Sequence, residues 1–405
     1  MTNASALVKI KELQAELKAL REAETARKKN ADPVKVKLYP TPKFKSESGD
    51  FEAKFVGFMQ ADGTWFIDDV TDNPDGTTIR RARVGLAGRF MKDFGYKFLY
   101  DFGNNHNPAL QDAFIAYKAS PKTSFIVGQY KEPIGLEWQS PSKYWTFAEL
   151  PAVTALTPRR SIGVGVIHKT DKFRVAVSAF GENSNKVRSD DEGYSFTGHA
   201  VFNPVHDKKR HMHVGASVSH RSPDAGSNAV SFKAKAETSA STGAIVNTGS
   251  ISDVDNILLY GAEALGIFGP VMFQGEWTTA DVSRDVSPDA TFDSYYAQAS
   301  WMMTGEMRTF NPKRHMFKRV SPARPFDPKN GDWGAVEVAV RYDSLNLNDG
   351  PFTGGEMNKV TTALNWHPNA LLRWSLNHQF VETDENAVNP NEEVNIFTGR
   401  AQVDF

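Results

Sequence analysis

The nine residues Phe397–Phe405, with the sequence FTGRAQVDF, alternate strictly between apolar and polar side chains. Successive side chains of a strand point to opposite faces, so this segment has one apolar and one polar face. Arg400 and Asp404 share the polar face, and Val403 and Phe405 share the apolar one. A soluble β domain could bury such an apolar face. The aromatic last residue instead favours the closing strand of an outer-membrane barrel, with lipid outside and water inside.

The same alternation recurs along the chain, with charged residues on the polar face in strand after strand. The clearest segments are Tyr96–Phe102, Phe273–Trp277, Tyr295–Trp301, Val336–Tyr342 and Trp374–Phe380. A face rich in Trp, Tyr and Phe opposite a charged face is typical of a water-filled barrel with aromatic girdles. At roughly 20–24 residues per strand and loop, the chain from residue 50 accommodates about 16 strands. The predicted fold class is all-β, a transmembrane antiparallel β-barrel of about 16 strands with an N-terminal α-helical coiled-coil segment.

Composition agrees with this fold. The chain has 405 residues, 23% of them charged, a mean hydropathy of −0.45 and no cysteine. It contains no run of roughly 18 apolar residues, but barrel strands need only about 10 residues, half of them polar. Residues 1–20 lack the apolar region of a secretory signal. Because a barrel must cross the inner membrane, we expect that a signal has been removed.

The N-terminal region predicts a helix over residues 3–29, followed by an extended neck. The helix repeats apolar residues in heptads, at Ala6, Ile10, Leu13, Leu17 and Leu20. The alternative is a single amphipathic helix lying on its own domain. The predicted domains are a periplasmic coiled-coil helix over 1–29, a basic, proline-containing neck over 30–49 and the barrel over 50–405. We expect the helix to form a trimeric stalk that is too short to associate strongly alone.

Two long segments between strands have different characters. Lys131–Thr157 contains Trp138, Trp145 and Phe147, so we predict that it folds inward and narrows a pore. Ser222–Asp255 is rich in Ser, Ala, Thr and Gly, and we predict a surface loop.

Arginine and lysine residues form three groups in the sequence, and these groups indicate anion binding. If Ala82 and Val84 face lipid, Arg81, Arg83 and Arg89 line the lumen in a column, because arginine on the lipid face costs about 2–4 kcal/mol. Rings of cations in a pore select anions, and Arg binds oxyanions through two hydrogen bonds. For the cluster over residues 308–329, capping a loop or binding lipopolysaccharide phosphate is the alternative. From these groups we take as pore residues Arg81, Arg83, Arg89, Arg159, Arg160, Arg308, Lys313, Arg314 and Lys318.

Enzyme signatures are absent from the sequence: it has no nucleophile elbow, zinc-protease helix or phosphate-binding loop. His211 and His213 could hold a metal on one strand face, but no cysteine or clear acidic ligand accompanies them. We therefore predict no catalytic residues, no metal site, no cofactor and no nucleic-acid partner.

A resemblance to a known family rests on a series of short motifs in one order. They are Ile79-Arg80-Arg81-Ala82-Arg83, Gly128-Gln129-Tyr130, Gly135-Leu136-Glu137, Ser140-Pro141-Ser142-Lys143, Thr304-Gly305-Glu306-Met307-Arg308, Arg341-Tyr342-Asp343-Ser344 and Leu364-Asn365-Trp366. From about Phe51 to Phe405 the chain resembles the phosphate-selective porin O/P family. The resemblance implies a trimeric 16-stranded barrel, a basic ladder and a central anion site.

Within this resemblance, Arg80, Arg81 and Lys143 fall on positions tied to the anion site. Strand alternation would place only one of the two arginines in the lumen, so both contribute only if the strand has a bulge or begins there. The chain departs from the family where Phe58 replaces an arginine and where Asn311 and Ser321 replace lysines. These departures favour a broader anion-preferring pore or a general pore over strict phosphate selectivity.

The sequence thus predicts a homotrimeric porin in the Gram-negative outer membrane, with its N-terminal segment in the periplasm. Its expected partners are outer-membrane lipid, lipopolysaccharide, small anions and peptidoglycan. The alternative function is a structural one, in which the stalk and the lysines of the neck tie the outer membrane to the cell wall.

Overall fold

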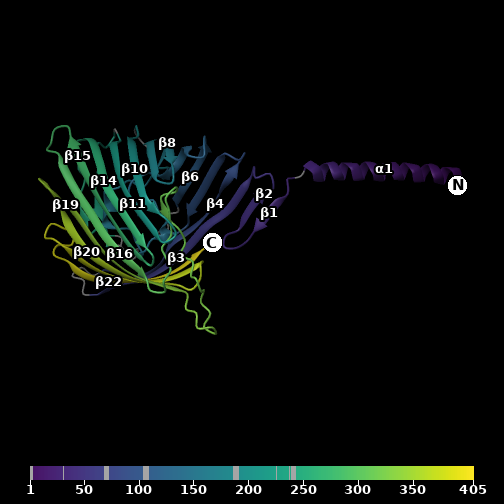
Figure 1. Cartoon of the computed structure of the whole chain (residues 1–405). Coiled ribbons are helices and arrows are strands. Elements are labelled where there is room, and N and C mark those ends of the chain that lie inside the picture. Colours follow the sequence, from purple (N-terminus) through teal and green to yellow (C-terminus); the bar gives the residue numbers. More distant parts are fainter. Residues whose placement is uncertain are drawn as a thin grey trace.

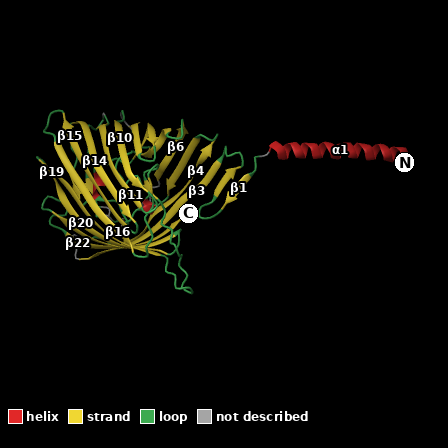
Figure 2. Cartoon of the chain, viewed as in Figure 1, coloured by secondary structure: helices red, strands yellow, loops and turns green. Residues whose placement is uncertain are grey.

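The computed structural model describes residues 3–30, 32–67, 73–103, 109–185, 191–224, 226–236, 238 and 243–405. Within them, strands curve into one barrel and a single long helix projects from it (Figures 1 and 2). The wall comprises 16 antiparallel strands. They are β3 (Glu52–Ile67), β4 (Gly76–Phe90), β5 (Phe94–Asp101), β6 (Ala109–Lys118), β7 (Thr123–Lys131), β8 (Arg160–Lys169), β9 (Phe173–Phe180), β10 (Tyr194–His206), β11 (Arg210–Ser222), β14 (Val254–Phe268), β15 (Val271–Arg284), β16 (Ala290–Met302), β19 (Ala335–Asp349), β20 (Phe352–His367), β21 (Leu372–Thr383) and β22 (Glu393–Asp404).

The barrel closes between its first and last strands. β22 pairs antiparallel with β3 in a register that runs from Asn395↔Ile67 to Asp404↔Phe58. Every other wall strand pairs with its neighbours in chain order, so the wall has no free edge. The predicted all-β barrel of about 16 strands, and Phe397–Phe405 as part of its closing strand, are confirmed.

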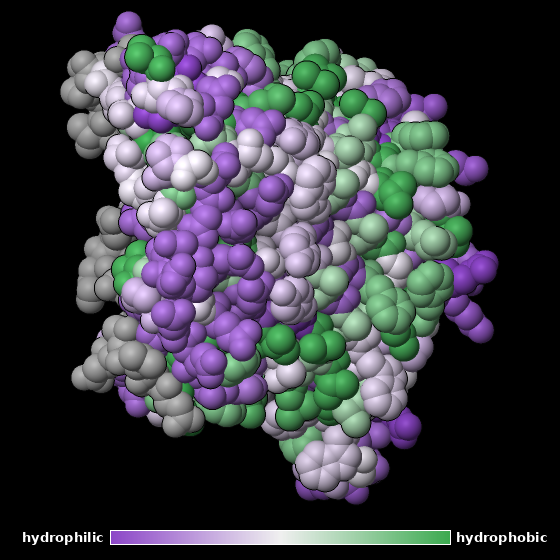
Figure 3. Space-filling model, turned by 90° about the vertical axis from the view of Figure 1, so that its left-hand side faces the viewer, coloured by the Kyte–Doolittle hydropathy of each residue, from purple (hydrophilic) through white to green (hydrophobic). Residues whose placement is uncertain are grey.

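Burial is inverted relative to a soluble protein. On β21 the Trp374 side chain is 53% exposed on the outside, whereas Arg373 beside it is 3% exposed on the inside. The same holds on β22, where Arg400 and Asp404 are buried. Figure 3 shows a hydrophilic loop end that gives way to a wall on which hydrophobic residues gather. This pattern fits a barrel with lipid outside and polar groups inside.

The two ends of the barrel differ in their connections. Short turns join β4 to β5, β6 to β7, β8 to β9, β10 to β11, β14 to β15 and β20 to β21. β3 begins and β22 ends at this short-turn end, so both chain termini emerge there. The segment 303–334, between β16 and β19, also starts there and contains β17 (Phe310–Asn311) and β18 (Met316–Phe317). Most connections at the opposite end are longer.

The N-terminal region leaves the barrel as a hairpin and a helix. In the region predicted as a neck, β1 (Val34–Lys37) pairs with β2 (Lys43–Ser46), which pairs with the start of β3. α1 (Asn3–Asn30) projects away from the wall (Figure 1). Its apolar residues Ile10, Leu13, Leu17 and Leu20 are 51–67% exposed, and the side chain of Ala6 lies outside the described ones. Among the described residues, no helix has both the length and the apolar character to span a membrane.

The long segment between β11 and β14 contradicts the prediction of a surface loop. It contains the small hairpin β12 (Lys233–Ala234) and β13 (Val246–Asn247). Phe232, Ile245 and Ile251 are buried in a hydrophobic cluster with wall residues such as Leu345. The few apolar residues of this polar segment are therefore enough to fold part of it into the barrel.

Candidate functional site: an arginine-lined constriction

The segment between β7 and β8 folds into the barrel, as its aromatic residues predicted. It carries two short helices, η1 (Ser142–Tyr144) and η2 (Ala152–Ala155). Trp145 and Phe147 are almost fully buried, and residues 132–159 form what we call the inward loop. Burial of aromatic side chains supplies the free energy that holds a loop inside a polar lumen.

Side chains of the wall, together with Arg308 of the segment 303–334, fix the backbone of the inward loop. Five carbonyls between residues 144 and 149 accept hydrogen bonds from them. The pairs are Arg308 Nη1 to Tyr144 (2.9 Å), Arg373 Nη1 to Trp145 (2.5 Å), Asn365 Nδ2 to Thr146 (2.8 Å), Arg400 Nη1 to Ala148 and Arg341 Nη1 to Glu149 (3.2 Å). Buried carbonyls need such partners, so the polar lumen wall determines the path of the loop.

Glu149 of the inward loop lies between three arginines. Arg80 donates to both carboxylate oxygens at 2.8 and 2.9 Å, and Arg81 does so at 3.2 and 2.9 Å. Arg400 Nη2 donates at 2.9 Å and also pairs with Asp62. Burial alone raises the pKa of Glu149, but the three guanidinium charges outweigh it and hold this pKa well below its usual range. The carboxylate therefore stays ionised, and the loop stays clamped, at mildly acidic pH.

A bulge in β4 allows both Arg80 and Arg81 to reach this carboxylate. Gln60 of β3 pairs with Arg81, whereas Ala61 pairs with Ile79, so Arg80 has no partner in the ladder. An extra residue of this kind redirects side chains that strict alternation would separate. The strand thus has the irregularity that two neighbouring inward arginines require.

The other predicted arginines of the wall, and Arg159 at the end of the inward loop, are separated rather than gathered. Arg83 Nε donates to Asp101 at 2.7 Å, and Arg160 Nε donates to Asp112 at 2.7 Å. Arg89 lies at the short-turn end, 3.6 Å from Glu52. The Arg159 guanidinium lies over the Trp138 ring. Of the predicted column, Arg81 and Arg83 are inside and Arg89 is at the rim.

Two predicted cations lie outside the constriction. Lys313 pairs with Asp171 in the β8–β9 turn at 2.7 Å, and both side chains are largely exposed. Arg314 is also exposed. Both therefore belong to the short-turn rim.

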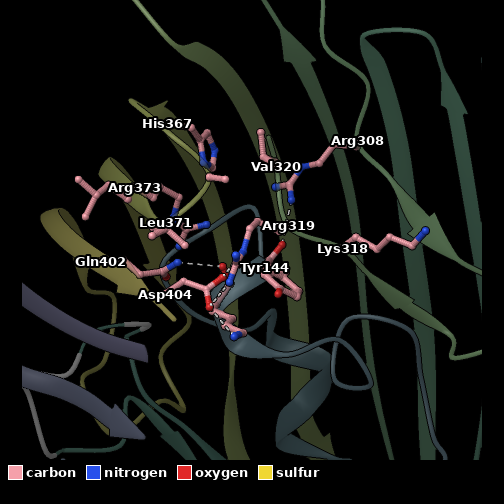
Figure 4. Close-up of a pocket in the computed structure, with 13 residues that line it drawn as sticks. Tyr144, Arg308, Lys318, Arg319, Val320, His367, Leu371, Arg373, Gln402 and Asp404 are labelled. Carbon is pink, nitrogen blue, oxygen red and sulfur yellow. Dashed lines mark hydrogen bonds and ion pairs between the residues drawn. The ribbon is translucent and has the colours of Figure 1, made fainter. Parts of the chain in front are cut away.

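A pocket at the short-turn end gathers the remaining predicted residues (Figure 4). Its basic lining residues are Lys143, Arg308, Lys318, Arg319, Arg373 and His367. The lining contains one carboxylate, Asp404, which binds Lys143 at 2.5 Å and Arg319 at 2.8 Å. In Figure 4 Lys318 extends away from the others. Arg308 is neutralised by Glu337, at 2.8 and 3.1 Å.

Arg373 is a buried cation of this pocket with no carboxylate bound to it among the described residues. Beyond the bond from its Nη1 to Trp145, its Nε and Nη2 atoms are buried without a hydrogen-bond partner in the part of the chain that the structure describes. Unpaired charged donors in a buried site favour an anionic ligand. The pocket therefore carries an excess of positive charge.

The replacement at Phe58 changes what borders this pocket. Phe58 is buried, and its ring lies 5.5 Å from the Arg83 guanidinium and 5.8 Å from Lys143 Nζ. Phe58 thus contributes cation–π contacts where the family resemblance implies another positive charge.

Several residues of the site were not among those predicted from the sequence. They are Glu149, Arg373, Arg400 and Asp404. Alternation along β21 and β22 already placed Arg373, Arg400 and Asp404 on the polar face, so charge on that face was the available signal. Arg319 belongs to the basic cluster over residues 308–329. No local pattern marks Glu149, because its partners lie far away in the chain.

A closed barrel with lipid-facing apolar residues and an arginine-lined constriction defines a channel of the outer-membrane porin class, which indicates a channel rather than an enzyme. The model of the family "Phosphate-selective porin O and P" matches residues 54–405, and the chain belongs to that family. Porin O of Pseudomonas aeruginosa is 24% identical over 376 residues, 83% of this chain and 84% of that protein.

Two solved structures share the fold. The anion-selective porin from Comamonas acidovorans aligns with a TM-score of 0.58 at 11% identity, over 87% of this chain and 99% of that one. OmpT of Vibrio cholerae, in its trimer form, aligns with a TM-score of 0.55 at 11% identity, over 87% and 99%.

Proposed function

We propose that this chain forms a trimeric porin through which small hydrophilic solutes diffuse passively and which prefers anions, including phosphate-like oxyanions. The observation that carries the anion preference is the pocket of Figure 4, where Arg373 keeps two unpaired buried donor atoms and Asp404 is the one carboxylate in the described lining. The anion selectivity of the Comamonas acidovorans porin, which has the same fold, supports this proposal.

The contacts of Glu149 indicate which kind of ligand the arginines around it can bind. Arg80, Arg81 and Arg400 hold a carboxylate through hydrogen bonds of 2.8–3.2 Å. Phosphate and carboxylate present similar oxygens to a guanidinium fork. A permeating oxyanion therefore meets groups suited to it while the loop carboxylate limits how strongly it is retained.

Reversal potentials across a planar bilayer under a potassium chloride gradient test this proposal. We expect the sign of a chloride-selective pore, and a reversal potential that shifts when phosphate replaces chloride. A potential of the cation-selective sign would contradict the anion preference without contradicting the pore.

Other observations support the proposed trimer and orientation. Short turns of outer-membrane barrels face the periplasm, so the short-turn end and α1 with it belong there. The uncovered stripe of Ile10, Leu13, Leu17 and Leu20 is suited to pairing with the same stripe of two more copies. The OmpT trimer supports the same assembly for the barrel. Tethering to peptidoglycan through the same stalk remains the alternative function.

A further inference from the structure

We propose that His199, Glu263 and His315 bind one divalent transition metal ion, with zinc as the best-suited class. These residues lie apart from the arginine pocket and from the clamp on Glu149. His199 stands on β10, Glu263 on β14 and His315 in the turn between β17 and β18. Their ligand atoms lie within 4.8 Å of one another, and all three residues are buried.

The two distances to Glu263 match the spacing that a metal requires. Nε2 of His199 and Nε2 of His315 each lie 3.2 Å from Oε1 of Glu263. Around a tetrahedral zinc ion with bonds of about 2.0–2.1 Å, neighbouring ligand atoms are roughly 3.3 Å apart. Two imidazoles and one carboxylate also form one of the ligand sets that leave a fourth position open.

His315 supplies an independent reason to expect a ligand. Its side chain is 0% exposed. Nδ1 has no hydrogen-bond partner among the residues described, and Nε2 lies 3.2 Å from Oε1 of Glu263 without forming a well-directed hydrogen bond. Its backbone has a φ of +53°, a conformation that non-glycine residues rarely adopt. A buried imidazole without well-directed hydrogen bonds is costly unless another group occupies its nitrogens.

The surroundings hold Glu263 in place. His213 Nε2 donates to the same Oε1 at 2.7 Å, in the manner of an outer group that orients a metal ligand. Gly215 faces the carboxylate, and a Cβ atom there would lie 2.7 Å from Oε1. The Phe310 ring packs against His213 and His315 and forms an apolar side of the site.

Arg174 disfavours metal binding at His199, which provides a second test of the proposal. Its Nη1 lies 3.3 Å from Nδ1 of His199, and because arginine only donates, Nδ1 accepts and Nε2 carries the proton. Metal binding at Nε2 needs the other tautomer. Removing Arg174 should therefore strengthen binding.

The experiment measures Co²⁺ and Zn²⁺ binding to the purified full-length porin in detergent by equilibrium dialysis, with the visible spectrum of bound Co²⁺ as a second readout. We expect one ion per chain, displaced by Zn²⁺. The chain has no cysteine, so a tetrahedral Co²⁺ spectrum would report histidine and carboxylate ligands. His315→Asn, which tolerates the positive φ, and Glu263→Gln should each weaken binding about 100-fold or more, since loss of an outer group alone costs about 10–100-fold.

Controls separate this site from other histidines. His206→Gln, in the neighbouring pair of His206 and His211, should leave the affinity unchanged. Arg174→Leu should bind more tightly. Binding that survives both His315→Asn and Glu263→Gln, or that weakens in Arg174→Leu, would overturn the site. Migration as an assembled trimer, compared between variants, excludes loss of folding as the cause.

Discussion

Most of the arginines inside this barrel are already engaged. Arg341 binds Asp343 at 2.7 Å, and Arg400 binds Asp62 through two bonds, with both side chains fully buried. Breaking such a buried pair by removing one partner costs about 3–5 kcal/mol, because the other charge remains. These arginines therefore build the constriction, and few of them are free to bind a solute.

Arg373 is the residue whose charge is most available to an anion. We predict that Arg373→Gln raises the phosphate concentration that half-blocks chloride current by roughly tenfold or more, since hydrogen bonds to charged groups contribute about 1.5–3 kcal/mol. Single-channel recordings with increasing phosphate measure this concentration. Arg89→Gln, at the rim beside Glu52, is the matched control and should change it little. If both variants raise this concentration equally, the preference for phosphate depends on the total positive charge of the channel and not on the pocket.

At the scale of elements, the inward loop and the segment 303–334 meet through Arg308. This side chain joins Glu337 of the wall to the Tyr144 carbonyl and to Thr146 Oγ1, the latter at 2.7 Å. Phe317 N also donates to Ser140 Oγ at 3.0 Å. The two segments enter the barrel from opposite ends and are held together by these hydrogen bonds. Both segments therefore form the constriction.

The sequence predicted the strands well because each carries its own period-two pattern. It predicted the inward loop from Trp138, Trp145 and Phe147, which lie close together in the chain. It did not predict that the parts 230–236 and 245–251 fold inward, because their apolar residues are sparse and gain burial only against Leu345 and its neighbours. The partners of Glu149 and Arg319 were hidden for the same reason, since residues up to 251 positions apart meet only in the closed barrel.

The N-terminal helix gives a prediction at this scale. Leu13→Asp with Leu17→Asp should make the stalk helix sensitive to protease while the barrels remain trimeric, because the short stalk depends on the barrels to bring its copies together. Limited proteolysis and native gels measure the two effects. Lys11→Asp with Lys18→Asp introduces the same residues outside the heptad core and should leave the stalk resistant. Trimers that dissociate in the core variant would mean that the stalk drives assembly.

For the whole molecule, the inverted burial determines where a charge is tolerated. Arg400 and Lys359 are buried inside the barrel, whereas apolar residues such as Trp374 and Val340 cover the outside. The lumen supplies carboxylates and carbonyls for its cations, and lipid supplies neither. An arginine therefore stabilises the barrel where it faces the lumen and destabilises the barrel where it faces lipid.

A charge placed on the outer wall tests this arrangement. Val340 lies in the middle of β19 and is 46% exposed, so Val340→Arg should lower the free energy of unfolding by about 2–4 kcal/mol. Met303, directly after β16 at the short-turn end, is 51% exposed, and Met303→Arg should cost only about 0–1 kcal/mol near the interface. Urea unfolding of the protein refolded into phospholipid vesicles measures both values. The difference arises because an arginine at the bilayer midplane has no water or phosphate within reach, whereas one at the interface does. Equal losses at the two positions would show that the β19 wall is not in contact with the hydrocarbon core.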